Sequence, residues 1–350
     1  MKKAIVLLLV CIMMLVFSSC YATEVSEPKR QAKSYYEYFD TVTTVYSYKG
    51  DAAEEFQANC DAVAQMLSEY HNLFDIYYEY SGVNNLCTVN KNAGVAPVAV
   101  DERLIDFLLY AKEIHALTKG KTNVAMGAVL SAWHDARSDA IDLGKQPWIP
   151  SKSELEELSH HTSIDSLVID KEGGTVFLSD PEASLDVGAL AKGYAVDRIR
   201  DLLVSRGASS YLLNVGGNLV GIGTRVNGDG WIAGVTHPNM AQDEQFVCKV
   251  TLSDVGCVTS GNYQRYFEKD GVRYHHLIDP ETLMPATYHS AVTVIVKDNA
   301  LGDALSTALF CMSREEGEKL IKEIGGVEAL WVSADYSEVY HTDGFPIVKE

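Results

Sequence analysis

The chain has 350 residues, of which 47% are hydrophobic, and it carries a formal net charge of −19 at pH 7. This length suffices for one large domain or two modest ones, and the hydrophobic content suffices for a sizeable core. The negative charge argues against a nucleic-acid partner, because phosphate binding needs basic patches, and an anionic ligand would need a local cation or a metal ion.

The N-terminus has the pattern of an export signal. Lys2 and Lys3 precede an apolar run over 4–17, which is too short and wrongly flanked for a membrane-spanning helix. Its end, VFSSC, resembles a bacterial lipobox with a lipidated cysteine; plain secretion with cleavage near Ala22 is the alternative. We predict a signal peptide over 1–19, a lipidated Cys20 on a flexible tether over 20–34, and a domain over 35–350. The protein would then lie outside the cytoplasm, anchored by lipid to the bacterial inner (plasma) membrane.

Five cysteines follow Cys20, and no CxxC pair occurs. An odd number at these spacings suggests neither a disulfide framework nor a zinc site, so buried thiols are the default interpretation. A Cys248–Cys257 bridge stays open.

Taken in chain order, the sequence alternates helical and strand patterns. Apolar residues recur at helical spacing over 51–77, over 101–120 with Asp101 as a cap, and over 189–208, 299–312 and 314–325. Strand patterns cover 38–50, a hairpin over 163–180, and then 211–223, 231–238, 248–261, 264–280, 289–297 and 328–335. Adjacent hairpins dominate the second half, so we predict a single α+β domain with mixed, largely antiparallel sheets flanked by helices.

Three stretches carry candidate chemistry. Asp303 and Thr307 are four residues apart and project from one helix face. Their hard oxygen donors suit Mg²⁺ rather than zinc, and a polar stripe on an amphipathic helix is the alternative.

The second stretch, DVGALAKGYAVD over 186–197, places Asp186, Gly188, Lys192 and Gly193 at a strand-to-helix junction. Helix-start N–H groups and the lysine would attract an anion such as a phosphate; a close-packed junction with an exposed lysine is the alternative.

The third stretch, RYHHLIDPETLMPA over 273–286, joins His275 and His276 to Asp279-Pro280. It fits a metal site, a catalytic base with its support, or a strand that runs into a turn.

Four ordered motifs together resemble the FAD:protein FMN transferase family, the ApbE-like flavin transferases. They lie at 186–197, 212–223, 259–280 and 302–310, and the resemblance runs from about residue 36 to the end. It implies that FAD reacts with a threonine or serine of an extracytoplasmic acceptor protein to give protein-bound FMN and AMP, with Mg²⁺ required.

The resemblance also implies a set of site residues. The metal ligands would be Asp303, Thr307 and the backbone carbonyl of Ala189, and Tyr80 would stack on the isoalloxazine ring. The implied FAD contacts are Phe39, Tyr80, Lys121, Thr122, Asn123, Asp186, Lys192, Ser260 and Leu277.

The chain departs from the family pattern in three places. Phe-Asp-Thr at 39–41 stands where the family has Met-Gly-Thr, Gly-Lys-Thr-Asn at 120–123 replaces Gly-x-Phe-Asp, and Leu283 replaces the glycine of Asp-Pro-x-Thr-Gly. These departures affect the expected flavin pocket.

Phosphoryl transfer needs a base for the acceptor hydroxyl, and histidine titrates near neutral pH. We assign His276 as the base, Asp279 as its supporting or metal-shell carboxylate, and His275 to the opposite face of the strand. Two alternatives remain: a Mg²⁺-dependent FAD pyrophosphatase that gives FMN and AMP, and a flavin-binding lipoprotein without chemistry.

Overall fold

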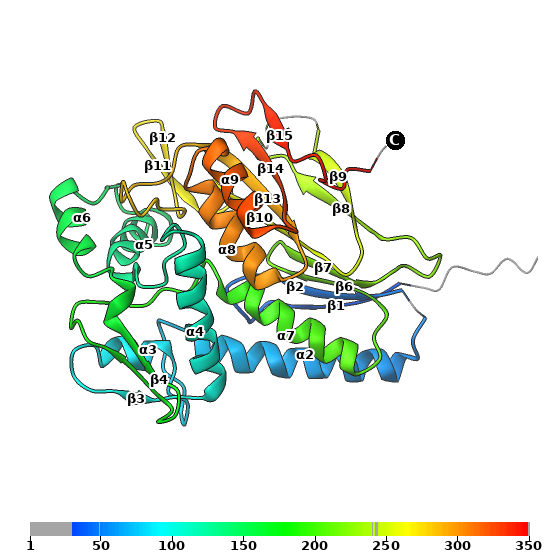
Figure 1. Ribbon diagram of the computed structural model, residues 1–350, viewed down its shortest axis with the longest axis horizontal. Helices are drawn as coiled ribbons and strands as arrows, with labels where there is room; N and C mark the ends of the chain where they lie inside the picture. Colours follow the sequence, from blue (N-terminus) through cyan, green and yellow to red (C-terminus); the bar gives the residue numbers. More distant parts are fainter. Residues whose placement is uncertain (1–29, 49, 240, 242–243, 349–350) are drawn as a thin grey trace, which may run out of the picture.

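An eight-stranded sheet runs through the centre of the molecule (Figure 1). The structure is a computed structural model that describes residues 30–48, 50–239, 241 and 244–348. Every neighbouring pair of strands in this sheet is antiparallel. The order across the sheet is β1 (Gln31–Tyr35), β2 (Thr43–Ser47), β6 (Ser210–Val215), β7 (Asn218–Gly223), β10 (Gly256–Gly261), β13 (His289–Val296), β14 (Glu328–Ser333) and β15 (Val339–His341).

Three smaller antiparallel sheets surround the central one. The β8–β9 hairpin packs on one face of the central sheet, where Trp231 and Val250 share a core with Leu330 and Val332. The small sheets are β8 (Trp231–Thr236) with β9 (Phe246–Leu252), β11 (Tyr266–Lys269) with β12 (Val272–His275), and β3 (Val98–Ala99) with β5 (Thr175–Leu178) and β4 (Leu167–Asp170).

Helices cover the opposite face of the central sheet, and β13 is buried along its whole length because both of its faces are covered. In Figure 1, α2, α7 and α8 lie in front of the sheet, and the remaining helices gather mostly on its left. The helices are α2 (Ala53–Phe74), α3 (Leu86–Lys91), α4 (Glu102–Leu117), α5 (Gly127–Ile141), α6 (Lys152–Ser159), α7 (Ala191–Ser205), α8 (Asn299–Phe310) and α9 (Arg314–Ile324), with a 3₁₀ turn η2 (Ile164–Ser166).

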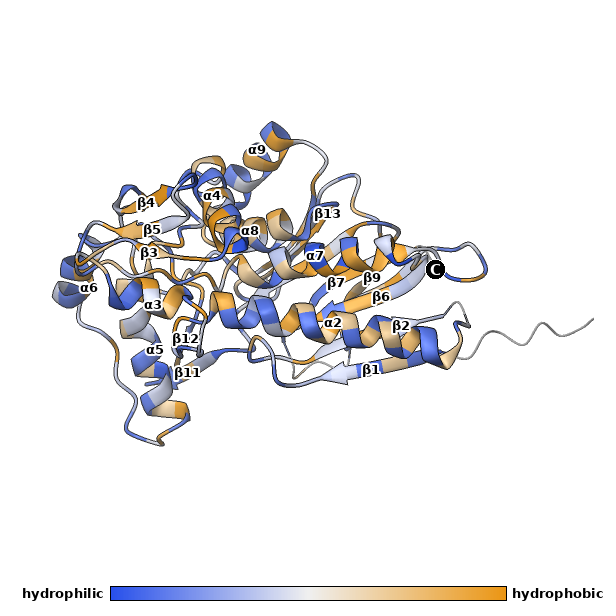
Figure 2. Cartoon of the chain, turned by 90° about the horizontal axis from the view of Figure 1, so that it is seen from below, coloured by the Kyte–Doolittle hydropathy of each residue, from blue (hydrophilic) through white to orange (hydrophobic). Residues whose placement is uncertain are grey.

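The helix α2 shows why these elements pack as they do. Phe56, Cys60, Val63 and Leu67 recur every three or four residues and are all buried against α7 and the sheet, while the outer face is polar (Figure 2). Full burial of such a side chain stabilises the fold by about 1.5–3 kcal/mol.

The described residues confirm the predicted α+β class and a single domain. The hairpin predicted over 163–180 is β4–β5, and the helix predicted over 101–120 is α4, which begins after the predicted cap Asp101. The predictions missed β1, α3, β3, α5, α6 and β15. The predicted tether ends too late, because β1 begins at Gln31 and pairs with β2.

The predicted signal peptide and Cys20 lie outside the described residues. Within the described ranges, no helix combines the length and the apolar character that crossing a membrane requires. The five cysteines from Cys60 onward are free thiols, so no Cys248–Cys257 bridge forms in the structure.

Candidate active site

The predicted metal ligands lie where α8 packs against the start of α7. Asp303 is almost fully buried, and its Oδ2 accepts a hydrogen bond from the backbone N–H of Gly193 at 2.9 Å. The Lys192 ammonium lies 3.6 Å from the same oxygen and also donates to the carbonyl of Gly188 at 3.2 Å. A buried carboxylate therefore faces an ammonium group at the helix start.

Thr307 lies one turn further along α8, beside Ser260 of β10. The two hydroxyl oxygens are 3.5 Å apart, and Ser260 Oγ lies 2.8 Å from Ser306 Oγ. The third predicted ligand, the carbonyl of Ala189, belongs to the turn just before α7. The predicted donors are therefore one carboxylate, one hydroxyl and one main-chain oxygen. Among the described residues no group of three or more His, Cys, Asp or Glu could hold a metal. The donor set fits Mg²⁺, which usually takes one or two carboxylates and completes its shell with water and substrate phosphates.

The loop before α7 is folded back by Asp186. Its Oδ1 accepts the backbone N–H of Gly188 at 2.9 Å, and its Oδ2 lies 3.8 Å from Nε2 of His134. The helix α7 begins without a side-chain cap, so nothing from a cap residue covers its N-terminal end. The loop thus places Asp186 and Lys192 beside the start of α7, where Asp303 accepts the N–H of Gly193 and the Val187 carbonyl accepts that of Ala191.

The two adjacent histidines point in different directions. His275 is buried with its ring edge-on to Phe310, and its Nε2 lies 2.9 Å from the carbonyl of Ala286. Its Nδ1 accepts the N–H of Leu277 at 3.2 Å, so Nε2 must carry the proton. Burial lowers the pKa of His275 to about 4. Both ring nitrogens are thus committed to the main chain.

His276 follows directly after β12 and is only half-buried. Its Nδ1 lies 3.2 Å from the carbonyl of Arg265, which also accepts the His276 backbone N–H at 3.2 Å. Because a carbonyl only accepts, Nδ1 carries the proton and Nε2 carries the lone pair. Burial, with a smaller effect of the Arg265 charge, lowers the pKa of His276 to about 3, so the ring is neutral at pH 7.

A narrow hollow of about 10 Å³ opens beside His276, between α5 and the β11–β12 hairpin. It is lined by Leu130, Trp133, His134, Arg137, Phe267, Tyr274, His275 and His276. The residue His134 was not predicted, yet it connects three parts of the site. Its Nδ1 lies 3.1 Å from the Tyr77 hydroxyl, and its Nε2 faces Asp186.

Tyr80 has its hydroxyl bound within the fold, and stacking of its ring on a flavin stays a prediction. Its hydroxyl donates to Asp75 at 2.7 Å and lies 3.3 Å from Nε2 of His71, so it bridges two side chains. The neighbouring Tyr77 is 59% exposed, but its hydroxyl end lies in the crevice beside His134. Burial of that end, and then the charge of Asp186, raise the pKa of Tyr77 to about 12. The Tyr77 hydroxyl thus lies beside the pair formed by His134 and Asp186.

Asp279 does not contact His276 in the structure. Its Oδ1 lies 3.0 Å from the Lys121 ammonium and accepts the N–H of Glu281 at 3.1 Å, and its carbonyl accepts the N–H of Leu283 at 2.8 Å. The structure therefore shows Asp279 paired with Lys121 rather than with His276, and its role as a metal-shell carboxylate stays a prediction. The buried pair with Lys121 instead holds the turn that follows the histidines.

Three other predicted FAD contacts are occupied by contacts within the fold. Thr122 is buried, and its hydroxyl donates to the carbonyl of Ala304 on α8 at 2.7 Å. Asn123 donates to the carbonyl of Thr162 at 2.9 Å and accepts the N–H of Ala125. Leu277 is buried in the core, and both its main-chain groups are hydrogen-bonded. These contacts hold the three residues within the fold, and a contact with FAD stays a prediction for each.

Two of the departures from the family pattern keep the backbone of the glycine they replace. Asp40 has φ 48° and Leu283 has φ 61°, both in the left-handed region. Phe39, with φ 55°, precedes Asp40, packs edge-on to His71 and donates its N–H to Nδ1 of that histidine at 3.3 Å. Non-glycine residues carry a cost in this region, so both turns are strained.

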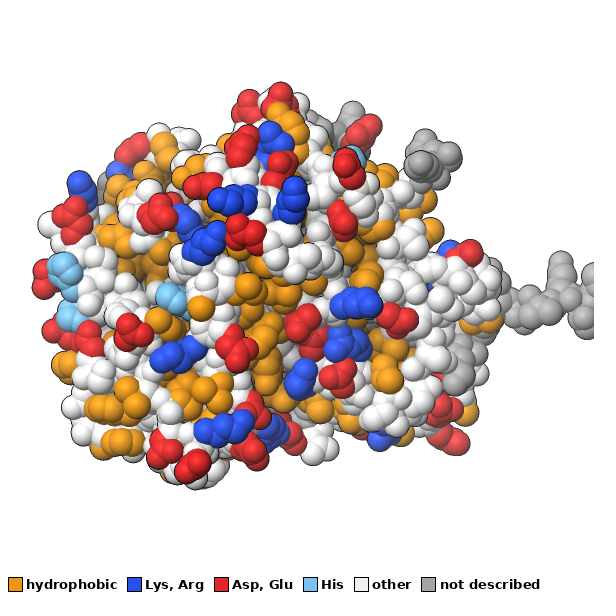
Figure 3. Space-filling model, in the orientation of Figure 1, with side chains coloured by type: hydrophobic (Ala, Val, Ile, Leu, Met, Phe, Trp, Pro, Cys, Tyr) orange, Lys and Arg blue, Asp and Glu red, His pale blue; other side chains and the backbone are white. Residues whose placement is uncertain are grey.

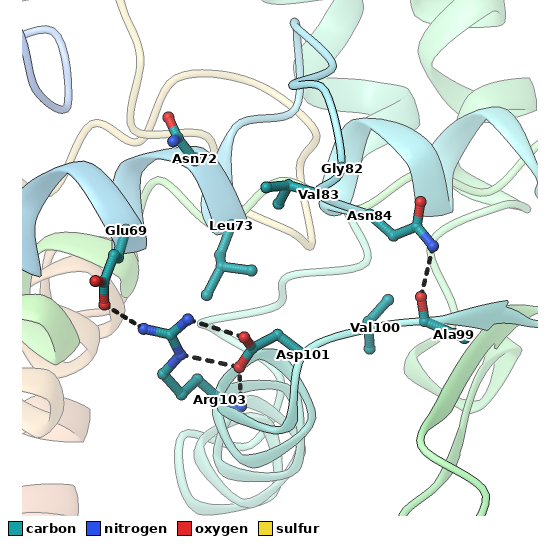
Figure 4. Close-up of a pocket in the computed structure, with 10 residues that line it drawn as sticks. All are labelled: Glu69, Asn72, Leu73, Gly82, Val83, Asn84, Ala99, Val100, Asp101 and Arg103. Carbon is teal, nitrogen blue, oxygen red and sulfur yellow. Dashed lines mark hydrogen bonds and ion pairs between the residues drawn. The ribbon is translucent and has the colours of Figure 1, made fainter.

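A larger hollow of about 330 Å³ lies elsewhere, between the C-terminal end of α2 and the start of α4 (Figure 4). Its charged side chains bind one another: Arg103 donates to both Asp101 and Glu69. Its charged groups are thus already paired with one another, whereas the smaller hollow contains His276. On the face drawn in Figure 3, basic and acidic side chains are interspersed.

Comparisons with known proteins agree with this geometry. The ApbE family matches residues 39–331. A FAD:protein FMN transferase of Treponema pallidum is 31% identical over 84% of this chain and 82% of its own length. One of Klebsiella pneumoniae is 29% identical over 79% and 83%.

Solved structures have the same fold. The ApbE protein of Thermotoga maritima superposes with a TM-score of 0.79 at 26% identity, over 90% of this chain and 97% of its own. The flavin transferase ApbE of Vibrio cholerae gives a TM-score of 0.75 at 25% identity, over 91% and 98%. From the extent of the family match and the identity to these relatives, the chain belongs to the ApbE family.

Proposed function

We propose that this transferase moves FMN from FAD to a threonine or serine hydroxyl of an extracytoplasmic acceptor protein, releases AMP and requires Mg²⁺. The family and the relatives named FAD:protein FMN transferase support flavin transfer. The observation that carries the proposal is the buried Asp303 carboxylate facing Lys192 at 3.6 Å, at the start of α7. Such a site suits a pyrophosphate whose charge is neutralised by a metal ion and an ammonium group.

Asp303, Thr307 and the carbonyl of Ala189 would hold the Mg²⁺ ion. When bound, the ion would supply charge neutralisation on the pyrophosphate oxygens. Lys192 sits where its ammonium can leave Asp303 for a phosphate oxygen, because it is partly open to solvent. The helix dipole of α7 adds a positive potential at its N-terminal end, beside Lys192.

His276 would act on the acceptor hydroxyl. Its Nε2 lone pair takes the proton as the hydroxyl oxygen attacks the phosphorus on the FMN side. The new P–O bond forms while the bond to the AMP phosphate breaks, and AMP leaves with that electron pair. A bound pyrophosphate favours the protonated imidazole, so FAD binding makes His276 a stronger base than it is in the free protein.

A FAD pyrophosphatase is the second candidate function, and one observation favours it. The hollow beside His276 has a volume of about 10 Å³, which is close to the space one water molecule needs. A water activated there would release FMN instead of transferring it. The same residues serve both reactions, so the acceptor decides between them.

The test is to incubate the purified protein with FAD, in Mg²⁺ or in EDTA, with and without a candidate acceptor. We expect AMP only in Mg²⁺ and only with the acceptor. Fast AMP release without an acceptor would establish the pyrophosphatase. FAD binding without any AMP would instead indicate a flavin-binding protein and would exclude both reactions.

We further propose lipid anchoring at Cys20, which places the site outside the cytoplasm. The support is the lipobox-like VFSSC end of the N-terminal segment. A Cys20→Ser variant should leave the membrane fraction. If it stays in that fraction, the apolar segment itself is retained.

A further inference from the structure

Arg265 connects His276 with a strained turn from the other end of the chain. Its carbonyl lies 3.2 Å from Nδ1 of His276 and accepts the His276 N–H at 3.2 Å. Its guanidinium Nη2 donates to the carbonyl of Asp40 at 3.2 Å. One residue before β11 therefore holds the imidazole with its main chain and the 39–40 turn with its side chain.

The turn that Arg265 binds is costly to form. Phe39 and Asp40 are consecutive and both left-handed, and such a conformation costs roughly 1–2 kcal/mol per non-glycine residue. Strain of this kind persists only where surrounding contacts hold it, and it gathers at functional sites. The contacts here are His71 Nδ1, which accepts the Phe39 N–H, and the Arg265 guanidinium on the next carbonyl.

We propose that Arg265 is a positioning residue for His276: its carbonyl keeps the imidazole proton on Nδ1, and its guanidinium ties that carbonyl to the 39–40 turn. This rests on the proposed function, in which Nε2 of His276 must be the lone-pair nitrogen. A ring with the proton on Nε2 has no lone pair on that nitrogen to accept the proton of the acceptor hydroxyl. The anchored carbonyl favours the productive tautomer before any substrate binds.

The charge of Arg265 works in the same direction. His276 is faced by Arg265 on its own hairpin, by Lys192 from α7 and by His275 in the preceding position. On α5, His134 and Arg137 line the same hollow, as does Tyr274 of β12. The charged side chains among these are basic, so each opposes protonation of His276. Replacing Arg265 by a neutral residue should therefore let His276 protonate at a higher pH.

The test compares Arg265→Gln and Arg265→Lys with Arg273→Gln. Arg273 is the control, because it is an arginine on β12 of the same hairpin, and its guanidinium stacks on Tyr266 at 4.1 Å. Two readouts are measured: the ¹⁵N shifts of the His276 ring as a function of pH, and FAD-dependent FMN transfer with FAD affinity measured separately. The ring shifts are read without FAD, so they do not depend on turnover.

In the wild-type protein we expect one tautomer, with the proton on Nδ1. In Arg265→Gln we expect a tautomer mixture, titration at higher pH, unchanged FAD affinity, and transfer lowered by about 10²-fold, the cost of misplacing a reacting group by about 1 Å. Arg265→Lys keeps the charge, so titration should stay near that of the wild type while transfer is only partly restored. Arg273→Gln should match the wild type in both readouts.

A wild-type tautomer and titration in Arg265→Gln would overturn the proposal, and so would an equal effect of Arg273→Gln. Weaker FAD binding with an unchanged ring would overturn it too, because Arg265 would then be a substrate contact. If Arg265→Gln does not fold, the Arg265→Lys comparison decides in the same way: a transfer rate equal to the wild type contradicts the proposal. If the wild-type protein transfers no FMN, the proposed function is refuted. The ring measurements would still test whether Arg265 positions His276.

Discussion

The backbone N–H of Gly193 on α7 donates a hydrogen bond to Oδ2 of Asp303 on α8 at 2.9 Å. The helices approach so closely there that a Cβ atom at residue 193 would lie 2.2 Å from the carbonyl oxygen of Asn299 and 2.7 Å from Cβ of Asp303. Because Gly193 has no side chain, α7 and α8 can approach closely enough to bring the Asp303 carboxylate beside Lys192.

Gly193→Ala should push α7 away from α8, because the new methyl group meets main chain on α8. We expect a loss of about 1–3 kcal/mol in the free energy of unfolding, as for other overpacked cores, measured by urea denaturation. Transfer should fall in the protein that remains folded, since Lys192 and Asp303 separate. Gly302→Ala is the control: its methyl would meet only side-chain atoms of Val296 and Val258 at 2.9–3.0 Å, which can shift. Equal losses in both variants would contradict this account.

Asp303→Ala should abolish Mg²⁺-dependent turnover while the protein stays folded. The carboxylate is the one acidic side chain of the proposed metal site, and charge neutralisation by a metal supplies several kcal/mol, so a fall of roughly 10²-fold or more is expected. AMP release is measured against Mg²⁺ concentration, with circular dichroism as the check on folding. Full activity would remove the metal assignment, and insolubility would favour a purely structural role for Asp303.

His276→Ala and His275→Ala should fail in different ways. Loss of a general base lowers the rate by about 10²–10⁴-fold, so His276→Ala should lose transfer and keep FAD affinity. His275→Ala leaves buried main-chain groups without partners, which costs about 1–3 kcal/mol of stability, and should turn over while folded. Transfer assays and thermal unfolding of both variants separate the effects. A slow but stable His275→Ala would reverse the two assignments.

The sequence predicted contacts between residues that are close along the chain and missed contacts between residues that are far apart along it. The pair Asp303 and Thr307 was predicted because both residues lie within one turn of a helix. The pair of Asp279 with Lys121 was not, because 158 positions separate the partners and no local period connects them. The same holds for the turn at Asp40, whose carbonyl partner is Arg265.

The helix α5 could have been predicted, and with it His134. Its buried residues Ala128, Val129, Ala132, Trp133 and Ala136 recur at helical spacing. The alanines make this a weak apolar stripe, and no side-chain cap marks its start. The spacing of the tyrosines does not predict their partners. In the structure the Tyr80 hydroxyl binds Asp75, and the Tyr77 hydroxyl lies beside His134.

Asp40→Gly should stabilise the protein by about 1 kcal/mol, because glycine adopts φ 48° without the steric cost of a side chain. The carboxyl group is exposed, so little packing is lost. The midpoint of urea unfolding measures the change. Asp254→Gly, at another exposed left-handed aspartate, is a useful comparison, although its side chain accepts the N–H of Gly223 and its gain should be smaller. A destabilised Asp40→Gly would show that the turn is not strained.

Acid should destabilise the protein through its buried histidines. Burial lowers the pKa of His275 and of His289 from 6.5 to about 4, so between these values the unfolded chain binds protons that the folded chain does not. Stability is therefore fully present above pH 6.5 and falls as the pH drops toward 4, by about 1.4 kcal/mol per pH unit for each histidine. Urea unfolding from pH 7 to 4.5 measures this slope. His289→Gln should reduce this slope by about 1.4 kcal/mol per pH unit. An unchanged slope would contradict the lowered pKa of His289 in the folded protein.

The most direct test is the intact mass of a candidate acceptor protein after incubation with this chain, FAD and Mg²⁺. The account predicts an acceptor heavier by FMN less one water, located on a threonine or serine, with one AMP released for each FMN attached. The gain should vanish with Asp303→Ala and fall steeply with His276→Ala. Free FMN and AMP in equal amounts, with the acceptor mass unchanged, would contradict the account and make the enzyme a FAD pyrophosphatase.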